Sequence, residues 1–159
     1  MAKASQDPIA FGLVMEMRIT EKIKTLTPGS KEMRAALKHV GNLIVLEAQK
    51  NIRKKNIVDT ERLLSSLRAI ITDRGTGLRV GTDVVYAQFH EKGSTAVTDD
   101  QRKAIFARLR EEGKLGKPSK GLLSGGNFTA RPYLGPAVDK VLGKNDINKI
   151  IREFLILGG

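Results

Sequence analysis

Side chains that could act as catalytic bases or metal ligands are scarce in this sequence. It holds two histidines, His39 and His90, and no cysteine, which excludes disulfides, thiol catalysis and thiolate metal sites. His39 lies beside the apolar stripe of a predicted helix, where a packed or exposed histidine is favoured over a catalytic one. His90 and Glu91 are adjacent, and in a strand adjacent side chains point to opposite faces and cannot hold one ion. We therefore expect no metal, no cofactor and no enzymatic activity.

The glycine-rich segment in the second half resembles a phosphate-binding loop only superficially. Pro118 stands where such a loop has the hydroxyl that holds Mg²⁺, and Glu111 stands where it has its first glycine. We interpret residues 113–127, with five glycines, as a long basic loop that is either functional or mobile. The lysines that this loop offers to a partner are Lys114, Lys117 and Lys120.

The balance of charge points to an acidic partner. Lys and Arg number 28 against 17 Asp and Glu, a net charge of +11 that is typical of proteins that meet nucleic acid, acidic protein surfaces or anionic membranes. The densest basic cluster, at residues 50–55, falls at a predicted helix end, so a solvated helix end and a phosphate-binding patch both stay open. Aromatic residues make up only 4%, which leaves few surfaces for stacking on bases.

No apolar run is long enough to span a membrane, and the first residues lack the apolar segment of a signal peptide. We therefore expect a protein made in the cytoplasm, without membrane contact.

The spacing of apolar residues predicts the elements that position these side chains. With 159 residues, 40% of them apolar, the chain can form a single domain around one core. Asp7 and Pro8 have the order of an N-cap and a first helical residue, which predicts a helix to about Leu26. Apolar residues at alternate positions from 11 to 19 fit a strand as well.

A second helix is the most strongly patterned element. Ser30 can cap it, and apolar residues recur every three or four positions from Met33 to Ile52. Short apolar alternations at 67–71 and 78–80, separated by turn-forming residues, predict a β-hairpin.

The rest of the chain is predicted to hold one more strand, at 84–89, and three helices. A short amphipathic helix opens at 99–100, and two C-terminal helices cover 135–143 and 146–155, the last with an apolar face that includes Leu155. These elements predict an α+β fold over residues 1–159. A long helix packs on a small, mostly antiparallel sheet, with C-terminal helices and a projecting helix-loop arm at 97–128.

Three segments, in order, resemble motifs of the virion morphogenesis, or tail-completion, family of long-tailed bacteriophages. Residues 58–67 (VDTERLLSSL) are similar to its Asp-Thr-Gly-x-Leu-x-x-Ser stretch. Residues 86–94 (YAQFHEKGS) are similar to its Tyr-Ala-x-x-x-Glu-x-Gly-Thr, and residues 130–137 (ARPYLGPA) to its Ala-Arg-Pro-Phe-Leu-x-Pro-Ala. With a helix before them and a helix after, the resemblance covers residues 30 to 157.

The resemblance implies a structural virion protein at the head-tail junction, or neck, that catalyses nothing. Identical subunits would close a ring, expected to be a hexamer, and dock to the neighbouring rings. Its partners would be further copies of the chain, the connector or stopper protein on one side, and the tail terminator or tail tube on the other. Contact with packaged DNA is a further expectation. The alternative is a small basic nucleic-acid-binding module that uses the cluster at 50–55 and the loop lysines.

The matched residues divide into two groups of expected roles. Asp59 or Thr60 can cap the turn that leads from the long helix to the first strand of the hairpin, and Gly93 can supply a turn conformation that other residues avoid. Tyr86 suits a core edge or a subunit contact, and Arg131, held extended by Pro132, suits an intersubunit ion pair or a solvated position. The candidate interface residues are Tyr86, His90, Glu91, Arg131, Tyr133, Lys114, Lys117 and Lys120.

Two departures from the family motifs have consequences. Glu61 replaces the usual glycine, which weakens the expectation of a tight turn at Thr60. Residues 96–127 separate the second and third motifs, where many members have only a few residues, and such insertions commonly meet particular neighbours.

Overall fold

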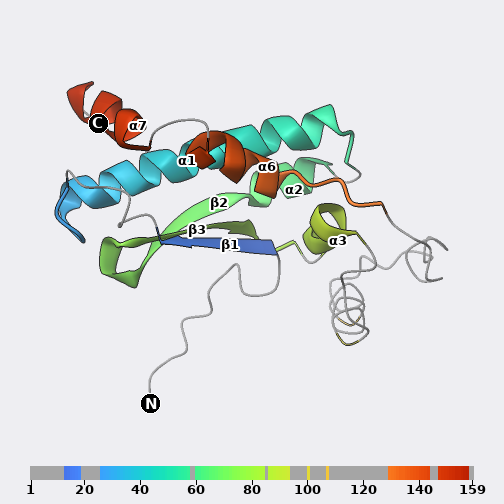
Figure 1. Cartoon of the computed structure of the whole chain (residues 1–159). Coiled ribbons are helices and arrows are strands. Elements are labelled where there is room, and N and C mark those ends of the chain that lie inside the picture. Colours follow the sequence, from blue (N-terminus) through green and yellow to red (C-terminus); the bar gives the residue numbers. More distant parts are fainter. Residues whose placement is uncertain are drawn as a thin grey trace, which may run out of the picture.

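The computed structural model describes residues 13–18, 26–57, 60–84, 86–93, 100, 107, 129–143 and 147–157. Within them a long helix packs on a three-stranded antiparallel sheet, with C-terminal helices beside it, so the predicted α+β class is confirmed (Figure 1). In chain order the elements are β1 (Leu13–Arg18), α1 (Lys31–Lys54), α2 (Thr60–Ser66), β2 (Arg68–Thr72), η2 (Asp73–Gly75), β3 (Gly77–Thr82), α3 (Ala87–Lys92), α6 (Leu134–Val138), η4 (Asp139–Gly143) and α7 (Ile147–Ile156).

Helix α1 forms where the apolar spacing predicts it. The Ser30 hydroxyl accepts a hydrogen bond from the Met33 N–H at 3.0 Å, which satisfies one of the free amides of the first turn. Its buried face carries Met33, Ala36, Leu37, Val40, Gly41, Ile44, Ala48 and Ile52. At Gly41 a Cβ atom would lie 2.5 Å from the Ala69 Cβ and 2.9 Å from the Leu78 Cδ1, so the absence of a side chain lets α1 approach the sheet closely.

The sheet has the order β1-β3-β2, and its two neighbouring pairs are antiparallel. The predicted hairpin is confirmed: β2 and β3 pair with Ile71 opposite Leu78. Arg74 and Gly75 have φ values of 58° and 101°, in the left-handed region that tight turns need.

The prediction of a helix to about Leu26 is wrong, because residues 13–18 form strand β1, which pairs with β3. Leu13 is buried, and Met15 and Met17 pack against the core. Burial of alternate residues on a sheet therefore decides between the two periodicities that this segment carries.

Three further expectations need correction. The strand expected at 84–89 is not found among the described residues of that range; β3 ends at Thr82 and helix α3 follows at Ala87–Lys92. Helix α2 occupies the connection after α1, where we expected a turn. The two C-terminal helices are present, as α6 with the π-helical turn η4 and as α7, but Leu155 is exposed rather than buried.

The arm at 97–128, with its predicted helix and basic loop, lies outside the described residues apart from 100 and 107. No helix of the described residues is long and apolar enough to cross a membrane.

Candidate functional site

The three segments that carry the family resemblance lie on three helices: α2 belongs to the first segment, α3 to the second, and the start of α6 to the third (Figure 1). The first and third border the C-terminal half of α1, where the Gln49 side chain donates to the Leu64 carbonyl and the Asn51 side chain donates to the Tyr133 carbonyl. Hydrogen bonds from buried or half-buried groups join the second segment to the third and the first to strand β3.

Glu91 joins the second segment to the third. Its carboxylate accepts backbone hydrogen bonds from Tyr133 (2.8 Å), Leu134 (2.9 Å) and Gly135 (2.7 Å), the first amides of α6. These amides have no partner within the helix, and a carboxylate also opposes the positive end of the helix dipole. Glu91 is only 8% exposed, so these bonds are shielded from water. Tyr133 stands at the N-cap position without a capping side-chain bond, and Glu91 supplies the cap from a distant segment.

Backbone and side-chain bonds from two other elements hold the same segment. The Arg131 N–H donates to the His90 carbonyl at 2.6 Å. From the end of α1, the Asn51 side-chain amide donates to the Tyr133 carbonyl at 3.0 Å, and the Lys55 ammonium donates to the Pro132 carbonyl. We call these bonds, together with those of Glu91, the Glu91 clamp. The clamp thus joins His90, which precedes the arm in the chain, to Arg131, which follows it.

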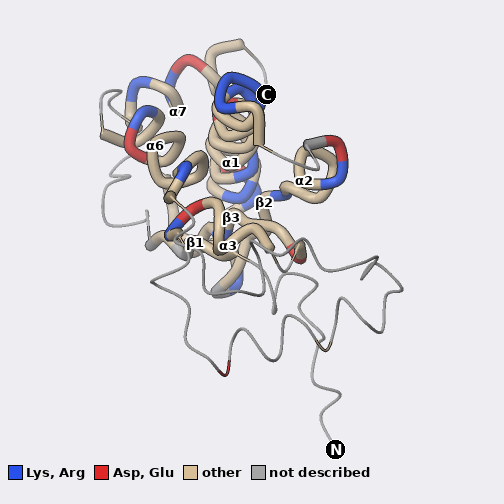
Figure 2. Tube along the Cα trace, turned by 90° about the vertical axis from the view of Figure 1, so that its right-hand side faces the viewer, with Lys and Arg blue, Asp and Glu red and all other residues tan. Residues whose placement is uncertain are grey.

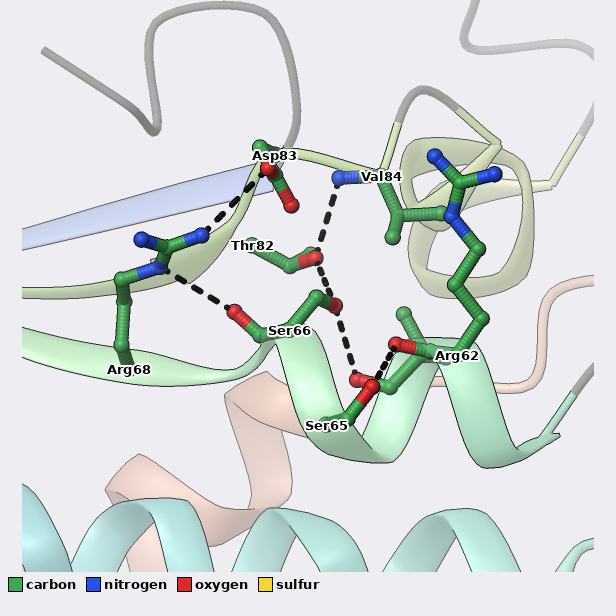
Figure 3. Close-up of polar contacts among 8 residues, drawn as sticks. Arg62, Ser65, Ser66, Arg68, Thr82, Asp83 and Val84 are labelled. Carbon is green, nitrogen blue, oxygen red and sulfur yellow. Dashed lines mark hydrogen bonds and ion pairs between the residues drawn. The ribbon is translucent and has the colours of Figure 1, made fainter.

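The first segment is tied to strand β3 through paired hydroxyls, shown in Figure 3. Ser66 Oγ lies 2.5 Å from the buried Thr82 Oγ1 and donates to the Leu63 carbonyl at 2.9 Å. Thr82 Oγ1 in turn accepts from the Val84 N–H at 3.0 Å. Since the Ser66 proton is used on Leu63, the Thr82 hydroxyl is the donor within the pair. This chain of bonds fixes the turn that leads from β3 into α3 and so positions Glu91.

His90 is buried beside the clamp. Its ring meets Tyr86 edge to face, with the centroids 6.0 Å apart. Burial lowers the pKa of His90, and the positive charge of Arg131 lowers it further. The histidine is therefore held in its neutral form over a wider pH range than a solvated one.

Tyr133 contributes apolar bulk rather than chemistry. It is fully buried, and its hydroxyl has no hydrogen-bond partner among the described residues. Burial raises the pKa of the Tyr133 phenol, with the Glu91 carboxylate adding to the effect. The phenol thus stays protonated and cannot serve as a base near neutral pH.

The structure sorts the predicted site residues into three groups. His90, Glu91 and Tyr133 are buried within the subunit, and a contact with a neighbour stays a prediction for them. Arg131 is exposed and Tyr86 is half-buried against the core. Lys114, Lys117 and Lys120 lie outside the described residues.

The predicted turn and cap residues can be placed only in part. Gly93 ends α3 with φ 79°, as expected of a residue in a glycine conformation. Pro132 accepts the bond from Lys55 at its carbonyl. Helix α2 begins at Thr60, while Asp59 lies outside the described residues.

Sequence analysis missed Asn51, Lys55, Ser66 and Thr82 as parts of the clamp and its support. For Asn51 a signal existed, because a polar residue on the apolar side of a helix needs a buried partner. Lys55 was counted with the basic cluster, although its ammonium is engaged within the fold.

A second feature is a cavity of about 350 Å³ between α1, η4 and α7. Its charged lining includes Glu47, whose carboxylate accepts a hydrogen bond from Lys140 at 2.6 Å. That bond lowers the pKa of Glu47. His39, on the same side of α1, stacks on Phe154 with the ring centroids 4.6 Å apart, and of the packed and exposed positions expected for it the structure shows the packed one.

Within the described ranges, no group of three His, Cys, Asp or Glu residues could hold a metal ion. Comparisons with family models, with curated proteins and with solved structures find no match to this chain.

Proposed function

We propose that this chain is a structural protein of a bacteriophage virion, located at the neck, where it completes the tail and joins it to the head. Copies of the chain assemble into a ring, expected to be hexameric, between the connector or stopper and the tail terminator or tail tube. Its mechanism is the complementarity of protein surfaces, and no chemical step is involved.

The observation that carries the proposal is the bond set between Glu91 and the backbone of residues 133–135. The glutamate of the second motif and the Arg-Pro-Tyr-Leu segment of the third were identified separately, 40 residues apart. In the fold they form one buried unit: the second motif supplies a carboxylate, and the third supplies the backbone amides that bond to it. This mutual dependence supports treating the second and third segments as parts of one family signature rather than as chance matches.

The surface next to the clamp suits contact with a neighbour. Arg131 and Lys92 are exposed there, and Tyr86 presents a half-buried ring. The bond between His90 and Arg131 joins residues that precede and follow the arm in the chain. A partner that binds at Arg131 and Lys92 would therefore contact a surface that buried hydrogen bonds hold in place.

The test is complementation of a phage that lacks its copy of this gene. We expect such cells to accumulate separate heads and tails, and plasmid-borne wild-type protein to restore joined particles. Arg131→Glu should fold but fail to restore joining, because it reverses a charge at the proposed contact. Arg74→Glu, an equal charge change at the exposed hairpin, is the matched control and should restore joining. Normal joined particles without the protein would overturn the proposal.

A further inference from the structure

The solvent side of α1 is strongly basic. Lys31, Lys38 and Arg53 are exposed, and at about 100° per residue they fall within about 60° of one another around the helix axis. We call these three residues the basic ridge. Exposed Lys50 and Lys54 flank it, and Glu32 is the one acidic residue of α1 that is exposed. Figure 2, which looks along α1, shows Lys and Arg on this helix.

The ridge cations are available to a partner. None of the three side chains forms a hydrogen bond or ion pair with another described residue, whereas the Arg34 side chain donates to the Gly29 and Arg74 carbonyls. The flanking Lys50 is 72% exposed, and its nitrogen lies 3.8 Å from Glu47. Unpaired cations along one line attract a polyanion without first breaking internal contacts.

We propose that the basic ridge binds the phosphate backbone of duplex nucleic acid, independently of sequence. Helix α1 has 24 residues and is therefore about 36 Å long, close to one turn of B-form DNA. Along that length a duplex presents a dense row of phosphates, which complements cations spread along an axis better than a compact acidic site does. This binding goes beyond the joining role and requires no ring.

Two other polyanionic partners fit the ridge less well. A helix that binds a membrane surface inserts an apolar face, and the apolar face of α1 is already buried against the sheet. Single-stranded nucleic acid is held largely by stacking on aromatic rings, and the ridge itself has none.

The test is fluorescence anisotropy with a labelled 30-base-pair duplex of random sequence, titrated from 50 to 200 mM salt. The ridge variant carries Lys31→Gln, Lys38→Gln and Arg53→Gln. The matched control carries Arg74→Gln, Lys92→Gln and Arg131→Gln, which remove the same charge from exposed positions outside α1. We expect the wild-type slope of log K against log salt to fall in magnitude by about 2.7 in the ridge variant, at about 0.9 per phosphate contact, and by less than about 1 in the control.

Melting curves identify any variant that fails to fold. If the triple ridge variant is unfolded, Lys38→Gln alone replaces it, and the slope is then expected to change by about 0.9. Equal reductions of the slope in the ridge and control variants would overturn the proposal, because they would indicate attraction by net charge alone. The proposal would also be overturned if the wild type did not bind the duplex at 50 mM salt, or if it bound vesicles rich in anionic lipid more tightly than the duplex.

Discussion

Glu91 caps the helix that Tyr133 opens, although 42 residues separate them: the Glu91 carboxylate accepts the Tyr133 N–H at 2.8 Å in a site that water hardly reaches. Caps normally come from residues next to the helix, which satisfy its first amides locally. Here the cap also joins α3 to α6.

Glu91→Gln should lower the free energy of unfolding by about 2 to 4 kcal/mol. The carboxylate offers two oxygens to three donors, whereas an amide has one oxygen and would turn an NH₂ group toward buried N–H groups. Urea denaturation measures the change. Glu153→Gln, at a position 61% exposed and 3.9 Å from Lys149, is the control and should cost less than about 0.5 kcal/mol. Equal effects of the two substitutions would show that the clamp is not a stabilising contact.

Acidification should destabilise the fold through His90. Burial and then Arg131 hold its folded pKa below the ordinary 6.5, so below about pH 6.5 the unfolded chain binds a proton that the folded chain resists. This stabilising contribution is thus present above pH 6.5 and is lost as the pH falls toward the folded pKa. Urea midpoints between pH 7.5 and 5.5 should fall more steeply for the wild type than for His90→Gln. If the urea midpoints of the two proteins fell equally with pH, His90 would not be the cause of the acid destabilisation.

Gly41→Ala should destabilise the protein by about 1 to 3 kcal/mol, despite a gain in helix propensity of about 1 kcal/mol. The added methyl would lie 2.5 Å from the Ala69 Cβ, which cannot rotate away, so α1 must move off the sheet. Gly143→Ala is the control, since no heavy atom lies within 4 Å of its added Cβ. Thermal melts should show a lower Tm for Gly41→Ala alone; an unchanged Tm would contradict the close packing of α1 on β2.

Deleting residues 97–128 and bridging with a short Gly/Ser linker should leave a folded domain. The His90 carbonyl and the Arg131 N–H, on either side of the deleted segment, are bonded at 2.6 Å, so the remaining residues and a Gly/Ser linker bridge two positions that are already in contact. The stability should change by no more than about 1 kcal/mol, since the cost of loop closure varies slowly with length. In the complementation assay the deletion should leave heads and tails separate. An unfolded product would show that the arm contributes to the core, and normal joining would show that it is not a docking element.

The fold was predictable where local periodicity and burial agree. The stripe from Met33 to Ile52 and the alternation on either side of residues 73–77 each fit one structure, and both form. The apolar residues of 13–18 fit both a helical and a strand spacing. Pairing with β3, a long-range contact, decides for the strand. Residues 84–89 looked like a strand because a short apolar run has no clear period, and β3 has already ended at Thr82.

The site was predictable in some of its members but not in its arrangement. The motif resemblance selected Pro132 as a turn residue and Glu91 and Tyr133 as interface candidates, but it gave no sign of the buried bonds that Glu91 forms. Burial depends on which distant segment covers a residue, and Asn51 and Lys55 reach the third segment from a helix about 80 residues earlier. Spacing within one segment carries no information on such contacts.

The central claim, a structural role at the neck of a virion, is tested most directly by electron microscopy of purified virions in which this chain carries a gold-labelled tag at its N-terminus. The proposed function predicts gold at the junction between head and tail, in a ring around its axis. Gold on the capsid shell or the tail fibres, or virions that lack the chain altogether, would contradict it.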